Sequence, residues 1–145
     1  MIECLTPWYL IFNAFAAHNC GDIYSSLPPS DFVSFSEYYP YFLKTFILEL
    51  PIYYVLLRRL KSGLKVLEIN LLVNLATHPF IFLLLPVLLS KTEATYLDYL
   101  LTAEVFAPAV EALLLAKAYK IPPWLSVLAA VAANLFSWSI GVYWL

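Results

Sequence analysis

Four long apolar runs, separated by short polar connections, constrain this chain more than any other feature of its sequence. They cover roughly residues 41–57, 66–89, 97–116 and 124–145. Crossing the hydrocarbon core of a bilayer takes about 20 mostly apolar residues in a helix. A helix is expected because lipid offers no hydrogen-bond partners to the backbone, and the alternation typical of membrane barrels is missing from these runs. The sequence therefore predicts an all-α, polytopic transmembrane bundle of four spans.

Composition supports the same class of protein. Charged residues make up only 12% of the 145 residues, whereas hydrophobic residues make up 63%. A soluble domain of this size exposes too much surface to cover it with so few charges. Eight basic and ten acidic residues give a net charge of −2, which argues against nucleic acid as a partner because nucleic-acid binders carry a basic excess. The expected partner is the lipid bilayer.

The basic residues predict how the spans are oriented. Four of them lie between residues 58 and 65 and two between 117 and 120, whereas the segment before Lys44 has none. Loops rich in lysine and arginine stay in the cytoplasm. We therefore predict a multi-pass protein with loops 58–65 and 117–120 in the cytoplasm and both termini on the outer side.

The first forty residues differ from the rest of the chain. We predict that residues 1–40 form an outer interfacial or loop segment and that residues 41–145 form the bundle. Residues 5–17 are apolar but short for a span, so an ordered outer cap is the preferred interpretation of residues 1–17. A signal peptide and a fifth span are the alternatives. Prolines and serines between residues 21 and 40 indicate a loop.

Cys4 and Cys20 are the two cysteines of the chain, and the predicted topology places both outside the cytoplasm. An oxidising compartment permits a disulfide between them. Such a bond closes a loop of about 15 residues, which is worth about 3 kcal/mol in the chain-entropy model. Two unpaired thiols in an interfacial segment are the alternative.

Ionisable and amide side chains lie inside the predicted spans, where each ionisable group costs about 2.5–3.5 kcal/mol to insert. Matching the spans by depth places these side chains in one slab near mid-membrane. Three prolines lie beside ionisable residues of the slab, and we expect each to kink its helix. No internal repeat is evident. The predicted cation, metal or proton site consists of Glu49, His78, Glu104 and Glu111, with Asn74, Asn134 and Ser137 as supporting polar residues.

Carboxylates and an imidazole in a medium of low dielectric favour a shared cation, because like charges repel and burial disfavours charge. The first hypothesis is therefore a protein that binds or translocates a cation, either a proton or a divalent metal such as Zn²⁺, Mn²⁺ or Fe²⁺. The second is an intramembrane hydrolase that activates water with Glu and His, with or without a metal. The third is a structural or accessory subunit of a membrane complex. The sequence leaves open whether the chain is an enzyme, which cofactor it holds and whether it forms a homo-oligomer.

Four short motifs follow one another along the predicted bundle. Together they resemble a pattern in small uncharacterised prokaryotic integral membrane proteins with four helices. The resemblance covers about residues 42–141; it implies that the bundle is one unit and implies no particular activity. The motifs are Glu49-Leu50-Pro51, Asn74-x-x-Thr77-His78-Pro79, Glu104-x6-Glu111 and Asn134-x-x-Ser137.

Overall fold

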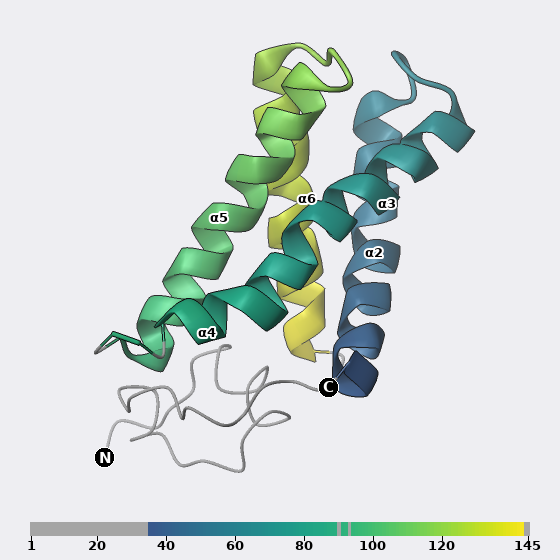
Figure 1. Cartoon of the computed structure of the whole chain (residues 1–145). Coiled ribbons are helices and arrows are strands. Elements are labelled where there is room, and N and C mark those ends of the chain that lie inside the picture. Colours follow the sequence, from purple (N-terminus) through teal and green to yellow (C-terminus); the bar gives the residue numbers. More distant parts are fainter. Residues whose placement is uncertain (1–34, 90, 93, 144–145) are drawn as a thin grey trace, which may run out of the picture.

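The computed structural model describes residues 35–89, 91–92 and 94–143. Within them the chain is helical and has no β-strand (Figure 1). The predicted outer cap, its alternatives and the two cysteines lie outside the described residues. The helices are α2 (Phe35–Leu57), α3 (Gly63–Pro79), the π-helix η2 (Phe80–Leu84), α4 (Leu85–Leu89), α5 (Tyr96–Lys117) and α6 (Pro123–Tyr143).

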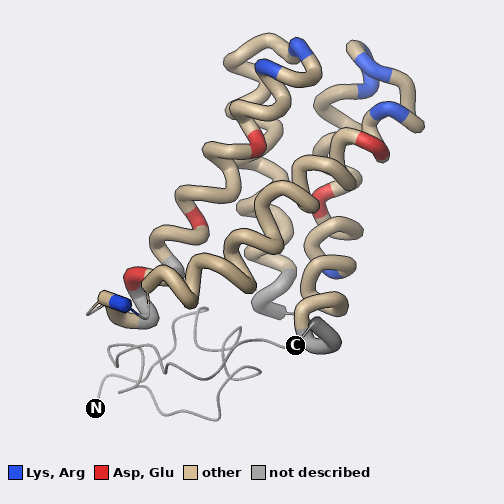
Figure 2. The backbone as a smooth tube through the Cα atoms, in the orientation of Figure 1, with Lys and Arg blue, Asp and Glu red and all other residues tan. Residues whose placement is uncertain are grey.

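The helices form a ring. The chain runs up α2, down α3, η2 and α4, up α5 and down α6 (Figure 1). α3 and α6 each pack against both α2 and α5, so the order around the ring is α2, α3, α5, α6. Most of the lysine and arginine residues lie in the two connections at the upper end of Figure 1 or in the helix ends beside them (Figure 2).

Three helical stretches are long and apolar enough to cross a membrane, namely Tyr38–Leu57, Gly63–Leu89 and Pro123–Ile140. Their outward surfaces carry large apolar side chains, among them Ile47, Leu64 and Val127. A soluble protein rarely exposes such a surface, whereas a bilayer covers it. The prediction of a helical bundle of the multi-pass membrane class is confirmed for these three stretches.

The first described helix begins earlier than the sequence suggested. α2 begins at Phe35 and contains Pro40, so residues 35–40 are helical and their prediction as a loop is wrong. Proline is a loop signal in sequence, but a single proline removes only one hydrogen bond of the helix and its φ angle fits a helix. Prolines are also more common in membrane helices than in soluble ones.

The prolines inside the spans have different effects on their helices. α2 continues through Pro51, and α5 continues through Pro108. At Pro79 the α-helical ladder ends and the π-helix begins, so the Leu85 N–H bonds to the Phe80 carbonyl, five residues back. Only at Pro79 does a proline in this group coincide with a change of helix type.

The π-helix also releases a backbone carbonyl. Leu85 N–H, the usual donor to Ile81 O, is turned to Phe80, and the next candidate donor position is Pro86, which has no N–H. The Tyr99 hydroxyl of α5 donates to the Ile81 carbonyl at 3.3 Å. The change to π-helical bonding therefore leaves the Ile81 carbonyl available to α5, and this hydrogen bond connects the lower half of the Gly63–Leu89 stretch to α5.

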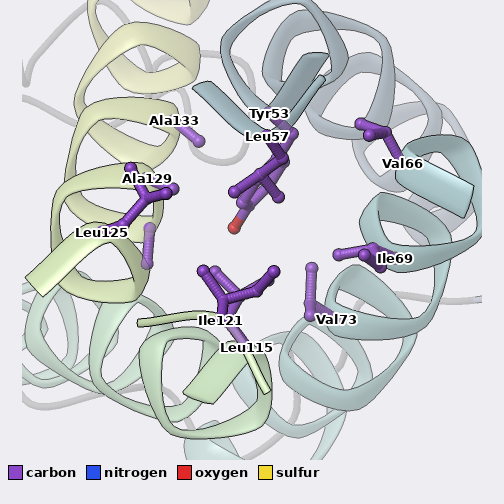
Figure 3. Packing of buried hydrophobic residues seen from close by; sticks show 11 residues of the cluster. Tyr53, Leu57, Val66, Ile69, Val73, Leu115, Ile121, Leu125, Ala129 and Ala133 are labelled. Carbon is purple, nitrogen blue, oxygen red and sulfur yellow. The ribbon is translucent and has the colours of Figure 1, made fainter. Parts of the chain in front are cut away.

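An apolar core fills the bundle near the two basic connections. Figure 3 shows its side chains converging from all four helices, with the Tyr53 hydroxyl directed into the centre. α6 contributes small residues such as Ala129 and Ala133, which allow close approach of neighbouring helices. Polar side chains, and not this apolar core, occupy the middle of the ring.

Candidate functional site

Two carboxyl groups, Glu49 of α2 and Glu111 of α5, are fully buried in the bundle. Helical spacing explains why both carboxyls are directed into the bundle. Four residues after Glu49 comes the buried Tyr53, and four residues after Glu111 comes the buried Leu115. Residues four apart share a helix face, so the faces that build the apolar core also turn the two carboxyls inward.

Glu49 is hydrogen-bonded to α3 and to α6. Asn74 Nδ2 donates to Glu49 Oε2 at 2.8 Å. On the other oxygen, the Ser137 hydroxyl lies 3.3 Å from Glu49 Oε1 and also donates to the Asn134 carbonyl of its own helix at 3.0 Å. Glu49 thus joins three helices through one side chain.

Glu111 has a similar set of partners and one more. Asn134 Nδ2 and the Tyr53 hydroxyl each donate to Glu111 Oε2 at 2.7 Å. The Thr77 hydroxyl lies 3.2 Å from Glu111 Oε1 and also donates to the Val73 carbonyl of its own helix at 3.0 Å. Glu111 thus joins α5 to all three other helices.

A second row of amides supports Glu49 on the α3 side. Asn70 Nδ2 donates to the Phe46 carbonyl of α2 at 2.8 Å, and Asn70 Oδ1 lies 3.2 Å from Asn74 Nδ2. Asn74 Oδ1 is buried and has no hydrogen-bond partner among the described residues. A buried acceptor without a donor is costly, and this amide oxygen has the chemistry to accept from a hydrogen-bond donor or to contact a cation.

We call the seven residues Glu49, Tyr53, Asn74, Thr77, Glu111, Asn134 and Ser137 the carboxyl cluster. The structure brings together five of the predicted site residues, which are Glu49, Asn74, Glu111, Asn134 and Ser137. Tyr53 and Thr77 were missing from the predicted set.

His78 lies outside the carboxyl cluster. Its ring stacks on Phe82 with centroids 5.5 Å apart and meets Phe42 edge-on at 5.9 Å. The residue is 8% exposed, and its Nδ1 has no hydrogen-bond partner within the described part of the chain. His78 is therefore an aromatic packing residue with one unused ring nitrogen, and it lies next to the cluster in sequence without a described hydrogen bond to it.

Helical geometry explains why Thr77 rather than His78 joins the cluster. At about 100° per residue, Thr77 lies about 40° around the helix from the fully buried Val73, whereas His78 lies about 140° away from it. The spacing of four residues from Asn70 to Asn74 to His78 drifts around the helix with each step. The signal that sequence reasoning missed is the spacing of seven between the two buried polar residues Asn70 and Thr77.

Glu104 is also separate from the cluster. It is partly buried on α5 and lies seven residues before Glu111, about 10 Å along the helix. The hydrogen bonds that connect the described cluster include neither Glu104 nor His78. The predicted four-residue set of Glu49, His78, Glu104 and Glu111 is therefore split into one pair and two single residues.

The chemistry of the cluster is that of an oxygen-rich site. Among the described residues no group of three or more His, Cys, Asp or Glu side chains could hold a metal ion. The cluster offers carboxyl, hydroxyl and amide oxygens and no imidazole or thiol. Such a set suits a proton or a hard cation better than the transition metals considered from the sequence.

Comparisons with protein-family models, with curated proteins and with solved structures find no match to this chain. The class of the protein therefore rests on its own structure. It is a helical bundle with three helices able to cross a membrane and with two acids buried among them.

Proposed function

We propose that the protein binds and translocates a cation within the membrane, and that the cation is a proton held at Glu49 and Glu111. One observation carries the proposal. Both carboxyls are fully buried, and within the described residues none of the side chains bonded to them is positively charged. Two ionised carboxylates cannot be buried together without compensation. A proton or another cation supplies the missing positive charge.

The proposed membrane arrangement has four spans. α5 has 22 residues and is about 33 Å long, which is enough to cross the hydrocarbon core, and Leu101, Val105 and Leu113 face outward on it. With the basic connections in the cytoplasm, both ends of the bundle lie on the outer side, and the ordered outer cap of residues 1–17 stays a prediction. The resemblance to small prokaryotic four-helix membrane proteins stays a prediction.

The position of His78 weighs against an intramembrane hydrolase. A general base and its partners must lie within hydrogen-bond reach of one another, and His78 is packed between Phe42 and Phe82. The role of a structural subunit is the alternative that the following experiment separates from proton transfer.

Proton movement can be measured in proteoliposomes that contain a pH-sensitive dye, with a valinomycin-clamped potassium potential as the driving force. We expect the wild type to carry protons and the variants Glu49→Gln and Glu111→Gln to carry at least tenfold fewer, an effect in the range seen for proton-transfer groups. Glu68→Gln is the matched control, because Glu68 lies on the surface and pairs with Lys65. Equal flux in all four proteins, or none above empty liposomes in the wild type, contradicts the proposal.

A further inference from the structure

The two buried carboxyls occupy equivalent places in two similar helix hairpins. We call α2 and α3 the first hairpin and α5 and α6 the second hairpin. α2 and α5 run in the same direction (Figure 1), and the ring order places each beside the partner helix of the other. A rotation of half a turn about the long axis of the bundle therefore exchanges the hairpins. Parallel repeats of this kind occur in membrane transporters, with the binding site between the repeats.

The residues of α3 and α6 match when the numbering is shifted by 60. Ile69 pairs with Ala129, and Val73 pairs with Ala133, and all four are fully buried. Asn74 then pairs with Asn134 and Thr77 with Ser137. A shift of 62 matches Glu49 with Glu111 in the same way. The sequence conceals this repeat because the paired core residues differ in size.

The hydrogen bonds obey the same rotation. Within each hairpin the asparagine donates to the carboxyl of its own hairpin, from Asn74 to Glu49 and from Asn134 to Glu111. Each asparagine also donates to the carbonyl four residues back, at 3.0 Å in α3 and 2.9 Å in α6. The hydroxyl three residues later reaches the carboxyl of the other hairpin. Two equivalent contacts thus join the hairpins, and the bond from Tyr53 to Glu111 is a third contact that the rotation does not repeat, because Leu115 stands at the matching position.

These two contacts reveal where hydrogen atoms are needed. Each hydroxyl has one hydrogen, and the backbone carbonyl is the nearer acceptor. Thr77 is 3.0 Å from the Val73 carbonyl but 3.2 Å from Glu111 Oε1. Ser137 is 3.0 Å from the Asn134 carbonyl but 3.3 Å from Glu49 Oε1. When the hydroxyl hydrogen lies on the backbone carbonyl, the bond to the carboxyl requires a hydrogen on Oε1.

The other oxygen of each carboxyl behaves as a carbonyl. Glu49 Oε2 accepts from Asn74, and Glu111 Oε2 accepts from both Asn134 and Tyr53. Two donors use both lone pairs of one carbonyl oxygen. In both residues, therefore, the amide side is an acceptor and the hydroxyl side has the place for a proton. With both hydroxyl hydrogens on the backbone carbonyls, the pattern is that of two neutral carboxylic acids.

The other titratable groups near the two acids do not change this hydrogen-bonding pattern. Tyr53 is a donor to Glu111, His78 and Glu104 lie outside the cluster, and α6 has no titratable residue over Pro123–Ile140. Lys44, the lysine of α2, lies about 140° around the helix from Glu49. No described cation is thus bonded to either acid.

We infer that the cluster is a pair of equivalent proton sites, one on Glu49 Oε1 and one on Glu111 Oε1, and that each proton forms the bond that joins one hairpin to the other. The inference rests on the proposed function and adds its stoichiometry and its structural consequence. After release of a proton to water, the hydroxyl of Ser137 or Thr77 turns its hydrogen from the backbone carbonyl to the carboxylate oxygen. The contact between the hairpins then persists with its direction reversed, and the hydroxyl gives up the bond to its own helix.

Infrared spectroscopy of the protein in lipid at neutral pH tests the inference, because a protonated carboxyl has its own C=O absorption, which shifts on H/D exchange. All proteins carry Glu104→Gln so that this third acid does not contribute. We expect the absorption to fall by about half in Glu49→Gln and in Glu111→Gln and to vanish in the double variant, as for two separate protons. Loss of the whole absorption in one single variant, or no absorption in the parent protein, overturns the inference.

A second set of variants keeps both acids and removes the proton acceptors. We expect Thr77→Val and Ser137→Ala to move half of the C=O absorption to higher frequency, since the acid O–H loses its partner. Ser126→Ala is the matched control, because Ser126 is buried on α6 but bonds to the Ile121 carbonyl. Unshifted absorption in both variants also overturns the inference. Absent proton flux beside an intact two-proton spectrum contradicts the proposed function alone, whereas intact flux beside a one-proton spectrum contradicts only this inference.

Discussion

Tyr53→Phe removes a single hydrogen bond from the carboxyl cluster. The hydroxyl of the fully buried Tyr53 donates to Glu111 Oε2 at 2.7 Å, and phenylalanine keeps the ring that packs in the apolar core (Figure 3). Hydrogen bonds between membrane helices average about 0.6 kcal/mol and reach about 1.7 kcal/mol. Because this bond is short and fully buried, we expect a loss of about 1–1.5 kcal/mol in the free energy of unfolding.

The structure also sets an upper limit on this loss. Asn134 Nδ2 donates to the same Glu111 oxygen at 2.7 Å, so the carboxyl keeps a donor after the substitution. No buried acceptor is left unsatisfied, and the larger cost of such a group, up to about 3 kcal/mol, does not apply. The loss should therefore remain well below that value.

Equilibrium unfolding in mixed micelles, followed by circular dichroism, measures the difference. A loss of about 1.4 kcal/mol lowers the folding equilibrium constant tenfold. Tyr54→Phe is the matched control, since Tyr54 is the next residue of α2 and is 47% exposed; it should leave the free energy of unfolding unchanged. Equal stability of the two variants, or a loss above about 3 kcal/mol in Tyr53→Phe, refutes this account of the hydrogen bond.

Three further predictions concern neighbouring features. His78→Phe removes a buried nitrogen that has no partner among the described residues and keeps ring packing, so its free energy of unfolding should rise by about 1 kcal/mol with proton flux unchanged; loss of flux would instead place His78 in the transfer path. Ala133→Leu overpacks a fully buried site and should cost about 1–3 kcal/mol in the same unfolding measurement, whereas Val131→Leu on the exposed face should cost nothing measurable. Treatment with a chelator should leave proton flux unchanged, because the described residues offer no group of three metal-binding side chains; a drop in flux that added zinc restores would contradict this.

The helical class and three of the spans follow from hydropathy alone, because only a helix satisfies its own backbone in lipid. The start of α2 does not follow from hydropathy, since a proline such as Pro40 is compatible with both a loop and the early turns of a helix. The π-helix after Pro79 is also beyond sequence reasoning. It arises where the ladder slips by one residue, and that slip is accompanied by a tertiary contact, the bond from Tyr99 to the Ile81 carbonyl.

The sequence predicts most residues of the candidate site, but it does not predict which of them are hydrogen-bonded to one another. Depth along the spans correctly grouped Glu49, Glu111 and the two asparagines, because the level of a residue follows from a rise of about 1.5 Å. Direction around the helix is a finer property, and the drift of about 40° for each four-residue step separates His78 from Asn70. The repeat of the two hairpins was invisible because it is shared by hydrogen-bonding side chains and not by the core residues that dominate the sequence.

Magnitudes also bear on the proposal that the two acids have more than a structural role. Five side-chain hydrogen bonds reach the carboxyls of Glu49 and Glu111, and at the membrane average they contribute about 3 kcal/mol together. Inserting two acids costs about 5–7 kcal/mol on the insertion scale. The bonds offset only part of that cost. The retention of two buried acids with matching asparagine and hydroxyl partners therefore supports the proposal that these acids hold protons.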